Sequence, residues 1–228
     1  MPTSLKTRSS GTTARREPGP PDRPRRRQRV AERKSAILDA ALGLFSRYGL
    51  RGVTVDQIAE AADVSKTNLF YYFRSKDEVY VAVLKRLLDD WLAPLESLTV
   101  DAEPLQAIED YVRLKMRMAQ AEPRSSRLFC LEVMQGAPMI GEELRTSLKD
   151  LVDRKAAIIR TWADEGKIAP VDPHHLIYAI WAMTQHYADF ATQVEAISGR
   201  GLDDPAFFDQ ATDNVLRLVI RSLAPDRA

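Results

Sequence analysis

A short segment rich in hydrogen-bond donors and aromatic hydroxyls lies between Ser65 and Ser75. Both serines are good helix N-caps, and Glu78 stands three residues after Ser75, as in a capping box. The segment between them has room for a helix of about two turns, which fits a DNA major groove. The side chains expected to face that groove are those of Lys66, Thr67, Asn68, Tyr71 and Tyr72.

The residues before this segment predict the helices that would hold it. Thr54 is a good N-cap with Gln57 in capping-box position, and apolar residues recur at helical spacing from Val55 to Ala62. Asp63 and Val64 make a turn, so the pattern is two short helices around a turn. A longer helix is predicted from Val30 to Tyr48, closed by Gly49. The side chains expected near DNA phosphates are Thr54, Ser65 and Lys76.

This part of the chain resembles the N-terminal domain of TetR-family transcriptional regulators. The resemblance rests on TVDQIA (54–59) and VSKTNLFYYFRSKDE (64–78), and it covers about residues 31 to 91. It implies a helix-turn-helix domain that binds double-stranded DNA. The alternative is a structural three-helix unit inside some other all-helical protein.

The charge distribution favours a polyanionic partner at the N-terminal end. The formal net charge is +1, yet residues 1–34 hold eleven Lys or Arg against three Asp or Glu. We expect residues 1–28 to be a disordered basic arm, because Gly, Pro, Ser and Arg dominate there without apolar periodicity. Such an arm can still follow phosphates or enter a minor groove.

The remainder of the sequence predicts helices and no convincing strand, hence an all-α fold. We divide the chain into the arm 1–28, a helix-turn-helix domain 29–91 and a helical ligand-binding and dimerisation bundle 92–228. A fourth helix starts at Ser75 and is ended or kinked by Pro94. The later helices are expected at about 104–120, 125–135, 140–165, 175–197 and 205–223.

The last two predicted helices are apolar on more than one face. A helix that is apolar nearly all round is buried in its own core or against a partner. TetR-like proteins dimerise through their last two helices, so the resemblance favours a homodimer built on 175–197 and 205–223. The alternative is a monomer with a thick core.

A second chemical pattern lies in the first of these two helices. Trp181, Gln185 and Asp189 follow one another at intervals of four residues and share one stripe of the helix. Polar groups in an apolar helix are costly unless they are satisfied, and such convergent groups suit a small-molecule pocket. The alternative is structural polarity, in which Gln185 and Asp189 bond to neighbouring helices.

Several segments also resemble the pyrimidine-utilisation regulators within the TetR family. They lie at 83–95, 125–138, 166–177 and 180–196 and span both predicted domains. The resemblance implies uracil or thymine as effector and a repressor that the effector releases from DNA. Gln185 and Asp189 can hydrogen-bond to such a ring, and Trp91 and Trp181 can stack on it, with Phe129 or Tyr111 closing the pocket. A regulator of an exporter or of another catabolic operon, with a different ligand, is the other possibility.

Other classes of protein fit the sequence less well. His186 and Asp189 could form an acid–base pair in a small helical enzyme, but no nucleophile sits in a recognisable setting, so we expect no enzyme. His174 and His175 lack further residues at ligand spacing, so we expect no metal and no cofactor. The single cysteine, Cys130, and the lack of a membrane-length apolar run favour a cytoplasmic protein.

Overall fold

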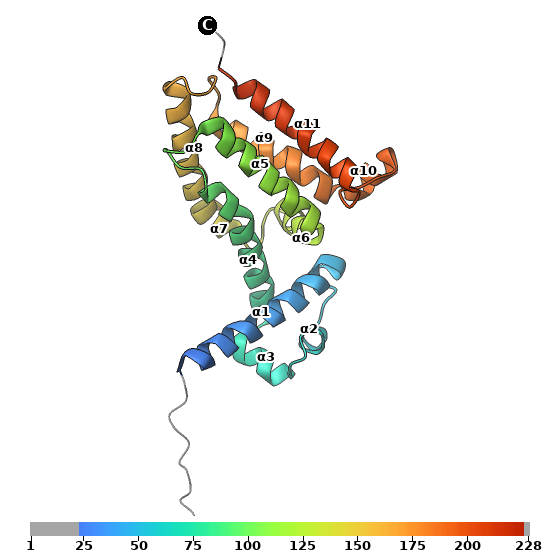
Figure 1. The fold of residues 1–228 in the computed structure, drawn as a ribbon. Helices are drawn as coiled ribbons and strands as arrows, with labels where there is room; N and C mark the ends of the chain where they lie inside the picture. Colours follow the sequence, from blue (N-terminus) through green and yellow to red (C-terminus); the bar gives the residue numbers. More distant parts are fainter. Residues whose placement is uncertain (1–22, 226–228) are drawn as a thin grey trace, which may run out of the picture.

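The computed structural model describes residues 23–225, and within that range it contains helices and turns but no strand. The all-α prediction is therefore confirmed. Figure 1 shows a small group of N-terminal helices below a larger helical bundle, with one helix, α4, running between them. The first four helices are α1 (Arg23–Tyr48), α2 (Val55–Ala61), α3 (Lys66–Tyr72) and α4 (Lys76–Glu96).

Local capping explains why helices α2 and α3 begin where they were predicted. The Thr54 hydroxyl accepts the Gln57 amide at 3.2 Å, and Gln57 Oε1 accepts the Thr54 amide at 2.8 Å. Ser65 Oγ caps α3 by accepting the Asn68 amide at 3.1 Å. In the turn between α2 and α3, Asp63 takes a positive φ of 51°, a conformation that Asp tolerates better than most residues.

The start of α1 differs from the prediction. The helix begins at Arg23, not Val30, so residues 23–28 of the expected disordered arm are helical. Residues 1–22 lie outside the described residues. The segment from Arg25 to Arg33 consists mostly of Arg, Gln, Ala and Glu, which are good helix formers. Such residues can extend the helix toward its N-terminus even though they provide no apolar face.

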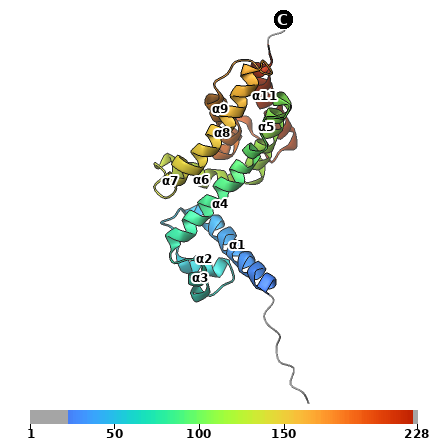
Figure 2. The ribbon, with the colours of Figure 1, turned by 90° about the vertical axis from the view of Figure 1, so that its left-hand side faces the viewer.

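Helix α4 runs on past Pro94 and ends at Glu96. The proline was expected to end or kink the helix, and it lies within the last turn. The carbonyl groups that follow are satisfied by a buried lysine from a later helix. Lys155 Nζ donates to the carbonyl oxygens of Glu96 and Leu98 at 2.9 and 3.1 Å. Figure 2 shows α4 passing from the lower helices into the bundle.

One helix of the bundle that was predicted to be continuous is broken. The segment predicted at 140–165 is helical throughout 141–164, with a π-helical turn near its start. The segment predicted at 175–197 breaks at Phe190, directly after Asp189, whose carboxylate is held by Ser126 of another helix. The bounds are α5 (Pro104–Ala121), α6 (Pro123–Met134), α7 (Gly141–Glu143), η1 (Leu144–Leu148), α8 (Lys149–Asp164), α9 (Pro173–Asp189), α10 (Ala191–Ser198) and α11 (Pro205–Leu223).

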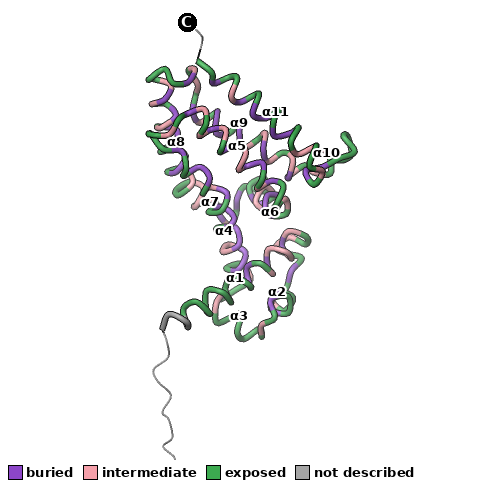
Figure 3. The backbone as a smooth tube through the Cα atoms, viewed as in Figure 1, coloured by how far each residue is buried: buried purple, intermediate pink, exposed green. Residues whose placement is uncertain are grey.

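Two apolar cores meet along α4, whose buried face is visible in Figure 3. The lower core joins α1 to α4 and includes Leu87, whereas the upper core begins at Leu95. Three residues from beyond the predicted domain boundary, Leu128, Ala137 and Ile140, also belong to the lower core. Helix α6 and the loop after it are thus packed into the N-terminal unit.

Candidate functional site

Helix α3 presents a row of donor-bearing side chains to solvent. Lys66, Thr67, Asn68 and Tyr71 are exposed, and Tyr71 is 71% exposed despite its large ring. Leu69 is fully buried and anchors the opposite face of the helix. Tyr72 is half-buried, with the Tyr71 ring edge-on to it at 5.2 Å between centroids. The arrangement gives a rigid, exposed helix that is free to enter a groove.

The residues expected near phosphates lie around this helix. Thr54 and Ser65 are exposed, and their hydroxyls accept the capping bonds described above. Lys76 Nζ donates to the Val53 carbonyl at 2.7 Å. Lys66 pairs with Asp56 at 2.9 Å, and both side chains are solvated. Such a surface pair contributes little to stability, so it can be exchanged for a phosphate contact.

Four of the six predicted ligand-binding residues line one small cavity of about 60 Å³ in the bundle. Trp91 comes from α4, Phe129 from α6, and Trp181 and Gln185 from α9. Two indole rings, one phenyl ring and one planar amide therefore meet at the same place. The other residues lining the cavity are Leu88, Leu92, Lys115 and Leu148.

Tyr111 stands behind this cavity and fixes one of its walls. The Trp181 Nε1–H donates to the Tyr111 hydroxyl at 2.6 Å, and Tyr111 is 1% exposed. Burial raises the pKa of the Tyr111 phenol above its ordinary value. The phenol is therefore neutral, and the indole N–H is already used, which leaves the ring face of Trp181 for a ligand.

Asp189 lies one turn beyond Gln185 and is not among the residues lining the cavity. Its carboxylate accepts a hydrogen bond from Ser126 of α6. Cys130, also on α6, lies close enough that burial, followed by the Asp189 charge, raises the pKa of the thiol to about 11. The His186 ring stacks on Phe190 with 5.0 Å between the ring centroids. His186 and Asp189 therefore face different neighbours and do not form an acid–base pair.

Lys115 is the polar residue lining the cavity that the sequence interpretation missed. It is 2% exposed, and its Nζ lies 3.9 Å from the centre of the Trp91 ring. Burial lowers the pKa of its ammonium to about 7, and the nearby Asp189 charge opposes that shift only in part. The signal was present in the sequence, since Lys115 follows Tyr111 by four residues and precedes Met116 on the apolar face of α5.

Two larger cavities adjoin the small one and share its walls. One, of about 390 Å³, lies between the N-terminal helices and the bundle and is bordered by Asp39, Arg86 and Trp91. The other, of about 670 Å³, is lined by η1, α8 and α9 and shares Leu148 and Trp181. Because 60 Å³ is on the order of two water volumes, a bound ring would extend into an adjoining cavity or move one of these shared walls.

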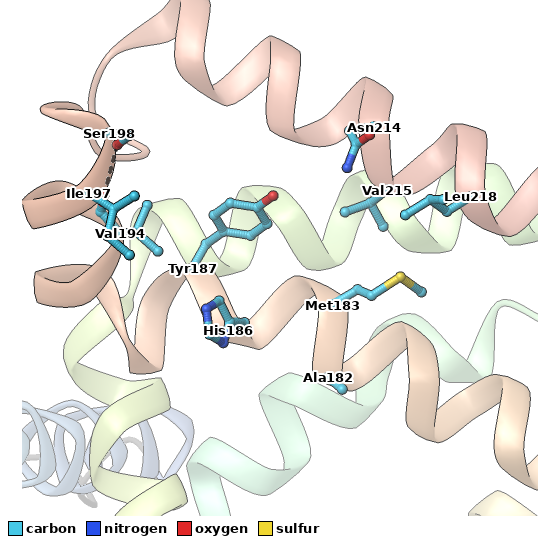
Figure 4. Close-up of a pocket in the computed structure, with 10 residues that line it drawn as sticks. All are labelled: Ala182, Met183, His186, Tyr187, Val194, Ile197, Ser198, Asn214, Val215 and Leu218. Carbon is cyan, nitrogen blue, oxygen red and sulfur yellow. Dashed lines mark hydrogen bonds between the residues drawn. The ribbon is translucent and has the colours of Figure 1, made fainter.

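An apolar groove of about 520 Å³ lies on the outer face of α9, α10 and α11, as Figure 4 shows. Ile197 and Leu218 line it and are 80% and 57% exposed. The inner face of α11 packs on α5. The apolar residues of α11 therefore lie on two sides: one side packs on α5, and the other lines the open groove. The lining residues are Ala182, Met183, His186, Tyr187, Val194, Ile197, Ser198, Asn214, Val215 and Leu218.

Residues 23–225 contain neither a candidate metal cluster nor a candidate membrane-spanning helix. In that range no three His, Cys, Asp or Glu side chains are grouped so that they could hold a metal ion. None of the helices described there has the length and hydropathy needed to cross a membrane.

Two family models together match most of the chain. Residues 37–83 match the model described as bacterial regulatory proteins, tetR family. Residues 84–226 match the model described as YcdC-like protein, C-terminal region. The division between them falls within α4, a few residues before the predicted boundary at 91.

Curated relatives and solved structures agree with these models. The chain is 52% identical over 201 residues to the HTH-type transcriptional regulator RutR of Escherichia coli O157:H7, covering 88% of this chain and 95% of that protein. It is 27% identical to the HTH-type transcriptional repressor SCO4008 of Streptomyces coelicolor, covering 75% and 85%. The ketosteroid regulator KstR2 of Mycobacterium tuberculosis has the same fold, with a TM-score of 0.66 at 19% identity, covering 85% and 96%.

A structure of AibR in complex with isovaleryl coenzyme A and operator DNA also superimposes, with a TM-score of 0.63 at 18% identity, covering 82% of this chain and 98% of that one. At such identity the likeness concerns the fold alone. The family models and the 52% identity carry the assignment, and they confirm the expectation of a regulator, not an enzyme. The chain belongs to the TetR family and is a DNA-binding transcriptional regulator.

Proposed function

We propose that this regulator is a homodimeric repressor that a pyrimidine base, uracil or thymine, releases from its operator. The observation that carries the proposal is the cavity in which Trp91, Trp181 and Gln185 converge. A pyrimidine ring is flat and has alternating carbonyl and N–H groups on its edge. The indole faces suit the ring, and the Gln185 amide offers one donor and one acceptor in a single plane.

The size of the cavity favours a small ring and links binding to movement. A lipid-like or multi-ring effector needs far more room than 60 Å³. A single ring that stays within the small cavity must displace Trp91, Phe129 or Leu148, and two of these belong to elements that pack against the N-terminal helices. Such binding therefore favours a different arrangement of α4 and α6. DNA affinity falls if, in that arrangement, the distance between the two α3 helices of the dimer no longer matches the spacing of the half-sites.

DNA binding would use α3 in the major groove. Lys66, Thr67, Asn68, Tyr71 and Tyr72 are the groups proposed to approach bases, and Thr54, Ser65 and Lys76 those near phosphates. Two copies joined through the groove of Figure 4 would bring two α3 helices to half-sites related by a two-fold axis. The operator should then be a pseudopalindrome, and a cytoplasmic location follows from the DNA partner.

Gel shifts with the DNA region upstream of the gene for this protein and its neighbouring genes test the proposed DNA binding. Asn68→Ala and Tyr71→Ala should each lose about 1–3 kcal/mol at one base position, whereas Lys76→Met should weaken all sequences alike and flatten the salt dependence. If both alanine variants bind the DNA as tightly as the parent, α3 does not contact the bases and the proposed interface is wrong.

Calorimetry with uracil, thymine and cytosine tests the ligand half. Uracil and thymine should bind the parent, and cytosine should lose about 1–3 kcal/mol because it exchanges a carbonyl for an amine. Gln185→Leu should lose affinity, while the exposed Gln193→Leu serves as the matched control. The pyrimidine assignment fails if neither uracil nor thymine binds the parent at millimolar concentration.

A further inference from the structure

Lys115 is a buried, cation-forming group at the cavity, and among the described residues its Nζ has no hydrogen-bond or salt-bridge partner. It is 2% exposed and lines the cavity beside Trp181 and Gln185. Its Nζ lies over the face of Trp91, 3.9 Å from the ring centre. An unpaired buried lysine is costly, so its position calls for a ligand.

The charges around Lys115 are few. Asp189 on α9 is the only charged group that acts on it, and that carboxylate is already bonded to Ser126 of α6. The Tyr111 phenol on the same helix and the Cys130 thiol on α6 both have raised pKa values and are neutral. The Trp91 face at the cavity wall favours a cation. The site can therefore accept one additional negative charge directly beside Lys115.

We propose that Lys115 takes up the acidic ring proton of a bound cyclic imide, so that the effector is held as an imidate paired with the Lys115 ammonium. The proposal rests on the pyrimidine function above and deepens it by naming the ligand class as acidic cyclic imides. The ring N–H bond breaks, and its electron pair stays on the ring, spread over the flanking carbonyl oxygens. A new N–H bond forms on Lys115, with no oxidant, reductant or other reactant involved.

The position of Lys115 prepares it for this step. Burial lowers its pKa to about 7, so a large fraction of the molecules at neutral pH carries a free amine that can act as a base. The ion pair that results is enclosed, where opposite charges attract more strongly than in water. Gln185 can donate its amide N–H to a ring carbonyl oxygen and hold the ring in plane.

The proposal predicts that affinity follows ligand acidity at constant shape. Thymine and 5-bromouracil differ by a methyl group and a bromine atom of similar size, and the bromine makes the ring more acidic. Each unit of acidity gained should tighten binding by up to tenfold. Calorimetry at pH 7 should therefore give a Kd for 5-bromouracil that is lower than that for thymine by about tenfold.

The ultraviolet spectrum of the bound base provides a second readout, because ionisation of the ring N–H between the two carbonyls changes the intensity and shape of its absorption band. Both bases are predominantly neutral when free at pH 7, so an imidate spectrum in the complex reports the proton transfer directly. In Lys115→Met, which keeps an unbranched chain of similar length, the imidate spectrum should vanish and the preference should shrink below about threefold.

The outcomes separate the two proposals. If the parent binds both bases equally, with the spectrum of the neutral ring, the proton transfer is wrong and the pyrimidine function stands. If the parent binds neither base, the pyrimidine function itself is wrong. Since the spectrum and the thymine comparison use the parent protein, a folding defect in Lys115→Met leaves the decision intact.

Discussion

Removing Lys115 should change the pH dependence of stability in the ligand-free protein. In the unfolded chain the lysine has its ordinary pKa of 10.5, whereas burial lowers it to about 7 in the folded state. Between these values the unfolded chain binds more protons than the folded one, so stability rises with pH. Below pH 7 both states are protonated, and the cost of burying the charge is constant.

The magnitude follows from the size of the shift. Each pH unit inside the window is worth about 1.4 kcal/mol, and near pH 7 the slope is about half of that. Raising the pH from 7 to 9 should therefore stabilise the parent by about 2 kcal/mol through Lys115 alone. Lys115→Met cannot titrate, so it should be more stable than the parent at pH 7, and its advantage should fall by about 2 kcal/mol at pH 9.

Urea unfolding of parent and variant at pH 7, 8 and 9, at one protein concentration, measures this difference. Groups that titrate in both proteins cancel in the comparison. A stability difference that does not vary with pH would show that the Lys115 ammonium has a normal pKa, and the electrostatic account of the cavity would fail with it.

Three further changes test the contacts that connect the parts of the molecule. Tyr80→Phe removes the 3.2 Å hydrogen bond to buried Glu132 and should cost about 1–2 kcal/mol in urea unfolding; an unchanged midpoint contradicts the contact. Lys155→Met leaves the carbonyls at the end of α4 without their donor and should lower the melting temperature by several degrees, about 2–4 °C for each kcal/mol lost. Leu218→Glu puts a charge on the groove of Figure 4 and should shift sedimentation from dimer to monomer; a monomeric parent would refute the groove as an interface.

Helices α2 and α3 could be predicted closely because their first residues are set by local chemistry. Thr54 with Gln57, and Ser65 with the amide of Asn68, are capping contacts that lie three residues apart in sequence. The pattern that identifies such a cap is therefore complete within one short window. The break at Phe190 is different, since the residue before it is held by Ser126, 63 positions away.

The ligand cavity could be predicted only in part for the same reason. Helical spacing brought Trp181 and Gln185 to one face, but the spacing also included Asp189, which the structure ties to α6 outside the lining. Lys115 was overlooked because a lysine on an apolar helix face is normally expected to reach solvent. The packing of α4, α6 and α9 around α5, which brings Trp91 onto the amine, encloses it.

Helix α6 connects the cavity to the DNA-binding unit over a short distance. Ser126 bonds to Asp189 at its first end, and Phe129 both lines the cavity and packs against the lower core. The Glu132 carboxylate then accepts two hydrogen bonds, one from the hydroxyl of Tyr80 on α4 and one, at 2.7 Å, from the backbone amide of Met139. Glu132 lies six positions after Ser126, about 9 Å along the helix at 1.5 Å per residue. A ligand that displaced Phe129 would therefore act on a short segment that contacts both units, and the Glu132–Tyr80 bond is one of the contacts by which α6 is joined to the DNA-binding helices.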